Sequence, residues 1–141
     1  MILGGILCVG RKEFMKYLKN RSFQRDLKDN GLDDEDLKKV LNDIFGERAM
    51  PLGHKIYKIR GAKEGKGKRG GFRSLFFWKE NEFIVFCLLF AKNEQHNLTS
   101  DEQKVLKILS TEYDKLTEDE IQKRIHRKAL TEVEYVKQSK E

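Results

Sequence analysis

The sequence predicts an α+β domain in which N-terminal and C-terminal helices pack on a small antiparallel β-sheet. The chain has 141 residues, the length of one ordinary domain. Helical spacing of apolar residues occurs on both sides of a central region that is rich in Phe, Ile, Val and Leu, which favour strands. Hydrophobic residues make up 38% of the chain, enough for a core, which excludes intrinsic disorder.

The first 14 residues differ in composition from the rest. We expect residues 1–14 to be a non-native or misassigned extension, with an ordinary first strand as the alternative. Their apolar part lacks the positively charged start and the cleavage site of a signal peptide. We expect the folded domain at residues 15–130 and a charged tail at 131–141.

Two helices are predicted in the first third of the domain. Ser22 is expected to cap the first helix, which ends at Asn30-Gly31. Asp33 or Asp34 caps the second, and Gly46 ends it. The apolar residues of the second helix follow helical spacing: Leu37, Val40, Leu41, Ile44 and Phe45.

Four strands are predicted, over residues 16–19, 55–60, 72–79 and 83–91. In the second strand, Tyr57 and Ile59 are expected to face the core. Lys58 and Arg60 are then exposed on the other face, which Ile56 joins only if the strand is bulged. The last strand is apolar on both faces, so we expect it to lie centrally, with helices covering one side.

Two more helices are predicted near the C-terminus. The first opens at residues 97–100, which acidic residues follow, and the second begins at Thr117. The first helix is expected to bury one stripe of side chains: Val105, Leu106, Leu109 and Tyr113.

Positive charge is concentrated in residues 55–73, which hold eight Lys or Arg residues against one acid, in a chain of net charge +6. A basic segment on a near-neutral body indicates a polyanion partner, and a solvated basic loop is the alternative. The glycines of this segment let backbone N–H groups approach a phosphate closely: Gly61, Gly65, Gly67, Gly70 and Gly71.

Several other classes of function lack their sequence patterns. The chain has no P-loop, Rossmann glycine pattern, HExxH or nucleophile elbow, so we expect no cofactor. Its three His are scattered and its two Cys lie far apart, so we expect no metal site. No apolar run approaches the roughly 18 residues of a membrane span. We therefore expect a cytoplasmic protein without a membrane partner.

Three motifs follow one another in order. The first is Lys58-x-Arg60, and the second is the loop GKGKRGG at 65–71, followed by Phe72-Arg73. The third is FAKNEQHNL at 90–98. In this order and spacing, the chain resembles the RelE/HigB-like toxins of bacterial type II toxin–antitoxin systems, from about residue 15 to residue 130.

The resemblance implies the RelE-like fold and a ribosome-dependent mRNA endonuclease, an mRNA interferase that inhibits translation. Such toxins cut the message in the ribosomal A site, where the RNA 2′-OH attacks the adjacent phosphate without a metal. The implied partners are the ribosome, mRNA and a cognate helix-turn-helix antitoxin of the HigA type.

The resemblance also suggests roles for individual residues. Arg73 is the first choice for bridging the scissile phosphate, because a guanidinium binds two oxygens at once. Lys58 and Arg60 are expected beside it, where one of them is a candidate to deprotonate the 2′-OH. The archetypal toxin has an arginine where this chain has Asn93, which leaves the general acid unassigned. The other catalytic candidates, among which we expect Lys92 to contact phosphate, are Lys92, Asn93, Glu94 and His96.

The remaining basic residues of the segment are expected to contact ribosomal RNA: Lys55, Lys66, Lys68 and Arg69. Four aromatic residues are expected in the core, with base stacking as the alternative: Phe72, Phe76, Phe77 and Trp78. Two other functions stay open at this point. One is a ParE-like poison of DNA gyrase, and the other is a non-enzymatic module that binds the ribosome or RNA.

Overall fold

The computed structural model describes residues 15–62, 71–91 and 98–135. In chain order, its elements are β1 (Lys16–Asn20), α2 (Arg21–Asp29), α3 (Asp34–Phe45), β2 (Met50–Gly53), β3 (Ile56–Gly61), β4 (Phe72–Lys79), β5 (Phe83–Ala91), α4 (Ser100–Asp114), α5 (Glu118–His126) and β6 (Leu130–Glu132). The α+β class is confirmed. Strands β2 and β6 were not predicted, and β6 begins at the end of the expected domain.

The sheet has six strands in the order β2-β3-β4-β5-β1-β6. Neighbouring strands are antiparallel except for β1 and β5, which pair in parallel. The expectation of an antiparallel sheet was therefore wrong for this one pair. The short strand β1 lies between β5 and β6, both of which come much later in the chain, so local sequence contains no signal for its neighbours.

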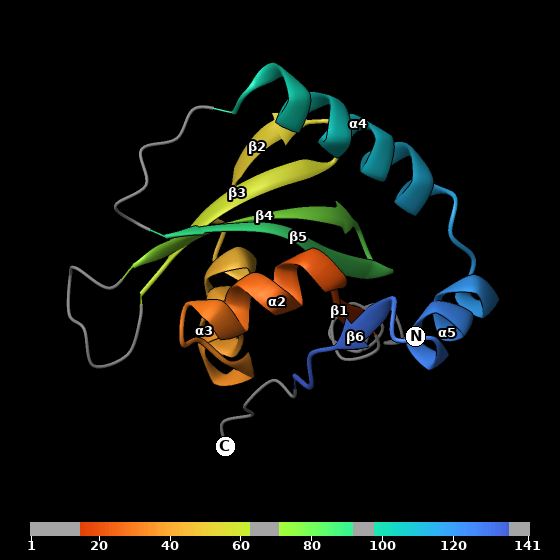
Figure 1. Ribbon diagram of the computed structural model, residues 1–141, viewed down its shortest axis with the longest axis horizontal. Helices are drawn as coiled ribbons and strands as arrows, with labels where there is room; N and C mark the ends of the chain where they lie inside the picture. Colours follow the sequence, from red (N-terminus) through yellow and green to blue (C-terminus); the bar gives the residue numbers. More distant parts are fainter. Residues whose placement is uncertain (1–14, 63–70, 92–97, 136–141) are drawn as a thin grey trace, which may run out of the picture.

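Helices cover both faces of the sheet, with α2 and α3 on one face and α4 on the other (Figure 1). Ile84 and Phe86 of β5 belong to the core cluster that includes α2 and α3. Val85 and Cys87 belong to a second cluster, which includes residues of α4 and α5. Strand β5 is thus central, as predicted, but the expectation that helices cover only one side was wrong.

The helices begin at side-chain caps, which satisfy the free N–H groups of the first turn. Asp33, one of the two predicted candidates, caps α3, and it also forms a capping box with Asp36. The prediction for α2 was wrong, because Asn20 rather than Ser22 accepts the N–H of Phe23, at 2.9 Å. In addition, Val105 is 48% exposed, so it does not belong to the buried stripe of α4.

The Cys87 thiol lies in the core, and burial raises its pKa to about 12. Only the thiolate reacts quickly with thiol reagents, so we expect this cysteine to be inert at pH 8. A Cys8→Ser variant should show no labelling by an aromatic disulfide reagent when folded, and one labelled thiol in denaturant. Labelling of the folded variant within minutes would contradict this placement of Cys87.

Candidate nucleic-acid interface

Three basic side chains come together on one face of the sheet. Arg60 of β3 lies directly opposite Arg73 of β4 in the antiparallel register. Lys58 is two residues from Arg60, so its side chain points to the same side of the strand. We call these three residues, Lys58, Arg60 and Arg73, the basic face. It includes the residues that the sequence predicted to surround the scissile phosphate.

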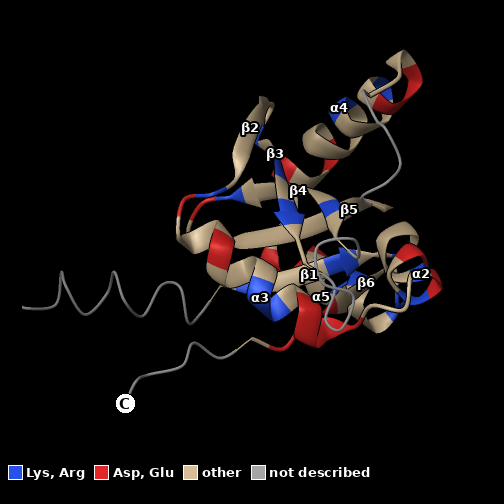
Figure 2. Cartoon of the chain, turned by 90° about the vertical axis from the view of Figure 1, so that its left-hand side faces the viewer, with Lys and Arg blue, Asp and Glu red and all other residues tan. Residues whose placement is uncertain are grey.

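The basic face lies on the same side of the sheet as α4, which covers the neighbouring part of that side. Ile56 lies on the same side of β3 and is buried in the cluster that includes α4. Its register with β4 is unbroken, so the prediction that Ile56 joins this side only through a bulge was wrong. Arg60 is exposed and Lys58 and Arg73 are half-buried. Figure 2 shows basic positions on β3 and β4 in the space below α4.

No acidic group neutralises the basic face within the described part of the chain. The structure gives no hydrogen bond or ion pair to the side chains of Lys58, Arg60 or Arg73 from any described residue. Other basic side chains have close acidic partners, as in the 2.7 Å pair of Arg124 with Glu112. Like charges on directly opposite strand positions repel one another. An anion bound between these side chains would relieve that repulsion, so the arrangement suits a phosphate.

Lys55 lies at the other end of β3, away from the basic face. It occupies the two-residue turn between β2 and β3, where His54 and Lys55 both have positive φ, as in a type I′ hairpin. Its ammonium group is 2.8 Å from the Asp114 carboxylate. The hydrogen bond from Lys55 holds the pKa of Asp114 below its usual value.

Several residues with predicted roles lie outside the described part of the chain: Lys66, Lys68, Arg69, Lys92, Asn93, Glu94 and His96. The aromatic residues expected in the core are found there: Phe72, Phe76 and Phe77 are buried, and Trp78 packs against the core that includes α2 and α3. Tyr135 packs against that same core, on the face of the sheet opposite the basic face.

The sequence did not indicate that Phe90 lies beside the basic face. Phe90 of β5 is directly opposite Arg73, and Leu88 is opposite Leu75. This register depends on a bulge, because Leu75 pairs with Leu88 while the next residue, Phe76, pairs with Phe86. The extra residue is Cys87, and without it Phe90 would face the other side of the sheet. A strand that is apolar on both sides contains no signal for such a shift.

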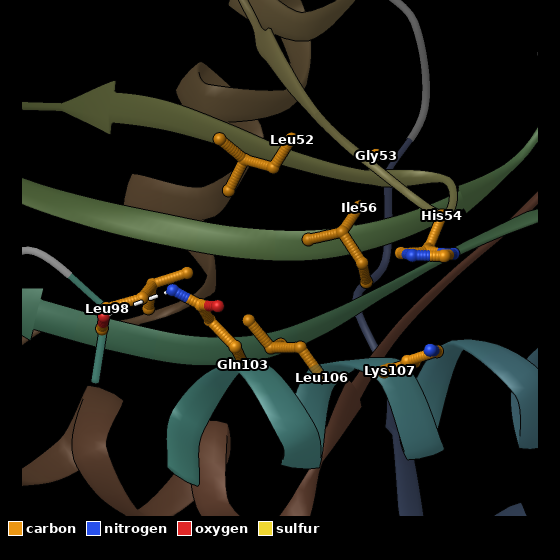
Figure 3. Close-up of a pocket in the computed structure, with 8 residues that line it drawn as sticks. All are labelled: Leu52, Gly53, His54, Ile56, Leu98, Gln103, Leu106 and Lys107. Carbon is orange, nitrogen blue, oxygen red and sulfur yellow. Dashed lines mark hydrogen bonds between the residues drawn. The ribbon is translucent and has the colours of Figure 1, made fainter. Parts of the chain in front are cut away.

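A pocket of about 470 Å³ lies between the β2–β3 turn and α4 (Figure 3). Its walls include Leu52, Ile56 and Leu106, and the Gln103 amide in it donates a hydrogen bond to the Leu98 carbonyl. None of the described residues that line it is acidic. Its titratable lining residues include His54 and Lys107, but it lacks the directly opposite arginines that suit a phosphate, so the basic face is the better candidate site.

The sequence matches the family model described as "RelE toxin of RelE / RelB toxin-antitoxin system" over residues 15–133. The chain belongs to the RelE toxin family. This RelE toxin is thus the toxin component of a toxin–antitoxin system, and its partner is a cognate antitoxin. The mixed sheet and the four helices of the described residues are compatible with the RelE-like fold.

Two further features of this RelE toxin concern metal ions and membranes. Its described residues contain no group of three or more His, Cys, Asp or Glu side chains that could hold a metal ion. Within the same ranges, no helix combines the length and the apolar character that crossing a membrane requires.

Gly61 and Phe72 form the last pair of β3 and β4, next to the pair of Arg60 with Arg73. A Cβ atom on Gly61 would lie 2.5 Å from Cζ of the Phe72 ring, so the ring packs where only a glycine leaves room. We expect Gly61→Ala to lower the free energy of unfolding by about 1–3 kcal/mol, because the ring must move.

The control for this clash is Phe72→Leu, which removes the ring from the same site. Urea unfolding of the wild type, the two single variants and the double variant measures the coupling between the two positions. The double variant should be less destabilised than the sum of the singles. Additive effects would show that Gly61 and Phe72 do not constrain each other.

Proposed function

We propose that this RelE toxin is a ribosome-dependent mRNA endonuclease that inhibits translation by cutting the message in the A site. The observation that carries this proposal is the basic face, where Arg60 and Arg73 are directly opposite and no described acid neutralises them. Unpaired cations at fixed positions stabilise the charge that develops on a phosphate in the transition state.

In the proposed reaction, the 2′-oxygen of one nucleotide forms a bond to the phosphorus that joins it to the next. The bond from phosphorus to the 5′-oxygen breaks, which leaves a 2′,3′-cyclic phosphate. A base takes the proton of the 2′-OH, and an acid gives a proton to the leaving 5′-oxygen. Atoms and charges balance without another reactant.

The proposal gives each residue of the basic face, and several residues outside it, a role in this reaction. Arg73 is proposed to bridge two phosphate oxygens, since its guanidinium is planar and donates in a fork. Lys58 and Arg60 stabilise the same charge, and one of them assists removal of the 2′ proton. The proposal assigns phosphate contact to Lys92 and takes the general acid from Lys92, Glu94 and His96. It assigns Lys66, Lys68 and Arg69 to ribosomal RNA.

The test is mRNA integrity in a cell-free bacterial translation reaction, with purified toxin and with or without ribosomes. The expected result is cleavage only during translation, with cut sites mapped within codons by primer extension. An intact message with translation still blocked would replace the proposal with a non-enzymatic ribosome binder. An intact message with normal translation would reject the proposal and leave gyrase as the target to assay.

A further inference from the structure

Phe90 lies beside the basic face, and the proposed reaction assigns it no role. Phe90 is directly opposite Arg73 and is only half-buried. The other aromatic residues of the core cluster on this face, Phe77, Phe83 and Tyr113, are buried. Within the described ranges, Phe90 is thus the one partly accessible Phe, Tyr or Trp ring in the core cluster on the side of the sheet that holds the three cations.

The two kinds of side chain form one row across three strands. Arg60, Arg73 and Phe90 occupy neighbouring positions on β3, β4 and β5. Side chains directly opposite each other on antiparallel strands lie about 5 Å apart at Cβ. The row therefore presents two guanidinium groups and then an apolar ring, and the bulge at Cys87 is what brings the ring to this side.

A nucleotide has the matching chemistry, since an anionic phosphate is joined through the sugar to a flat apolar base. Aromatic side chains bind unpaired bases by stacking, and every base has a face that can stack. We infer that Phe90 stacks on the base next to the scissile phosphate and so holds the message against Arg73. This inference rests on the proposed function. Because stacking tolerates every base, Phe90 contributes to substrate binding and positioning more than to the choice of codon.

The first test compares Phe90→Leu, which removes the ring but stays apolar, with Phe90→Trp, which keeps a ring. In ribosome-dependent cleavage, Phe90→Leu should lower kcat/KM by roughly 5- to 100-fold, and Phe90→Trp should recover most of the loss. Leu109→Ala is the matched control, since Leu109 also packs partly buried against this core cluster, but from α4. It should change the melting temperature and leave kcat/KM within about twofold of wild type. Equal kcat/KM for Phe90→Leu and wild type would overturn the inference.

A second readout measures stacking without cleavage. The probe is an mRNA with 2-aminopurine in the A-site codon, next to a 2′-O-methyl nucleotide that cannot attack its phosphate. Stacking quenches 2-aminopurine fluorescence, so wild type and Phe90→Trp should quench it on programmed ribosomes, and Phe90→Leu should not. No difference between the wild type and Phe90→Leu would overturn the inference even if the wild type cuts mRNA. Quenching that needs Phe90, with no cleavage of ordinary mRNA, would support the stacking and reject the proposed reaction.

Discussion

Arg73→Ala is expected to slow ribosome-dependent mRNA cleavage by about 10²–10³-fold, the usual loss when one fixed donor to a transition-state charge is removed. Arg73 lies between Arg60 and Phe90 in the row across β3, β4 and β5. Its side chain forms no ion pair or hydrogen bond with a described residue that would have to break when a phosphate binds. Arg73→Lys should fall between the wild type and the alanine variant, because lysine keeps the charge and loses the fork of donors. Single-turnover cleavage rates at saturating toxin measure both effects.

The matched control is Arg25→Ala, which removes the same charge from an exposed site on α2, the helix that packs on the face of the sheet opposite α4. Its cleavage rate should stay within about twofold of wild type. If Arg73→Ala cut mRNA as fast as Arg25→Ala, Arg73 would have no special role in the reaction. The two variants together separate a local effect at the basic face from a general effect of net charge on ribosome binding.

The sequence was sufficient to predict part of the basic face. Alternation along β3 places Lys58 and Arg60 on the same side, and this needs only the two-residue period of a strand. The position of Arg73 opposite Arg60 depends on the register between β3 and β4, which the long connection between them does not determine. Phe90 joins the row only through the bulge at Cys87, and an all-apolar strand shows no pattern that reveals a bulge.

The same distinction between local and long-range signals explains which parts of the fold could be predicted from the sequence. The starts of α3 and α5 were predicted because Asp33 or Asp34 and Thr117 are residues that favour the cap position, and Asp33 and Thr117 are the caps observed. The predicted start of α2 was wrong because Asn20 and Ser22 are both residues that favour the cap position. Asn20 has the extended backbone of a cap, and its side chain accepts the N–H of Phe23. The parallel pairing of β1 with β5 joins segments distant in sequence, so no local pattern predicts it.

A buried charge is a further feature that the sequence did not indicate. Lys19 lies in β1 between Phe86 of β5 and Thr131 of β6, and is only 3% exposed. Its ammonium group is 2.6 Å from the carboxylate of Asp34, the first residue of α3. This ion pair ties the middle of the sheet to the N-terminus of α3, where a negative side chain is also favoured by the helix dipole.

Removing the acid from this pair is expected to be strongly destabilising. Asp34→Ala leaves the Lys19 ammonium buried without a counter-charge, which should lower the free energy of unfolding by about 3 kcal/mol. Urea unfolding followed by circular dichroism measures the loss. Asp43→Ala is the matched control, because the one ion pair of Asp43 with a described residue is a long 3.7 Å pair with an exposed arginine. It should change stability by less than about 1 kcal/mol.

Replacing Lys19 instead should lower the free energy of unfolding much less. This difference identifies the unpaired ammonium group as the cause of the loss in Asp34→Ala. Lys19→Met keeps a long apolar side chain in the core, and the carboxylate of Asp34, 38% exposed, is still reached by water. We expect this variant within about 1 kcal/mol of wild type, and the double variant with Asp34→Ala close to Lys19→Met alone. The loss in Asp34→Ala would then come from the stranded ammonium and not from missing packing. An equally large loss in Lys19→Met would contradict this account, because the pair itself would then stabilise the fold.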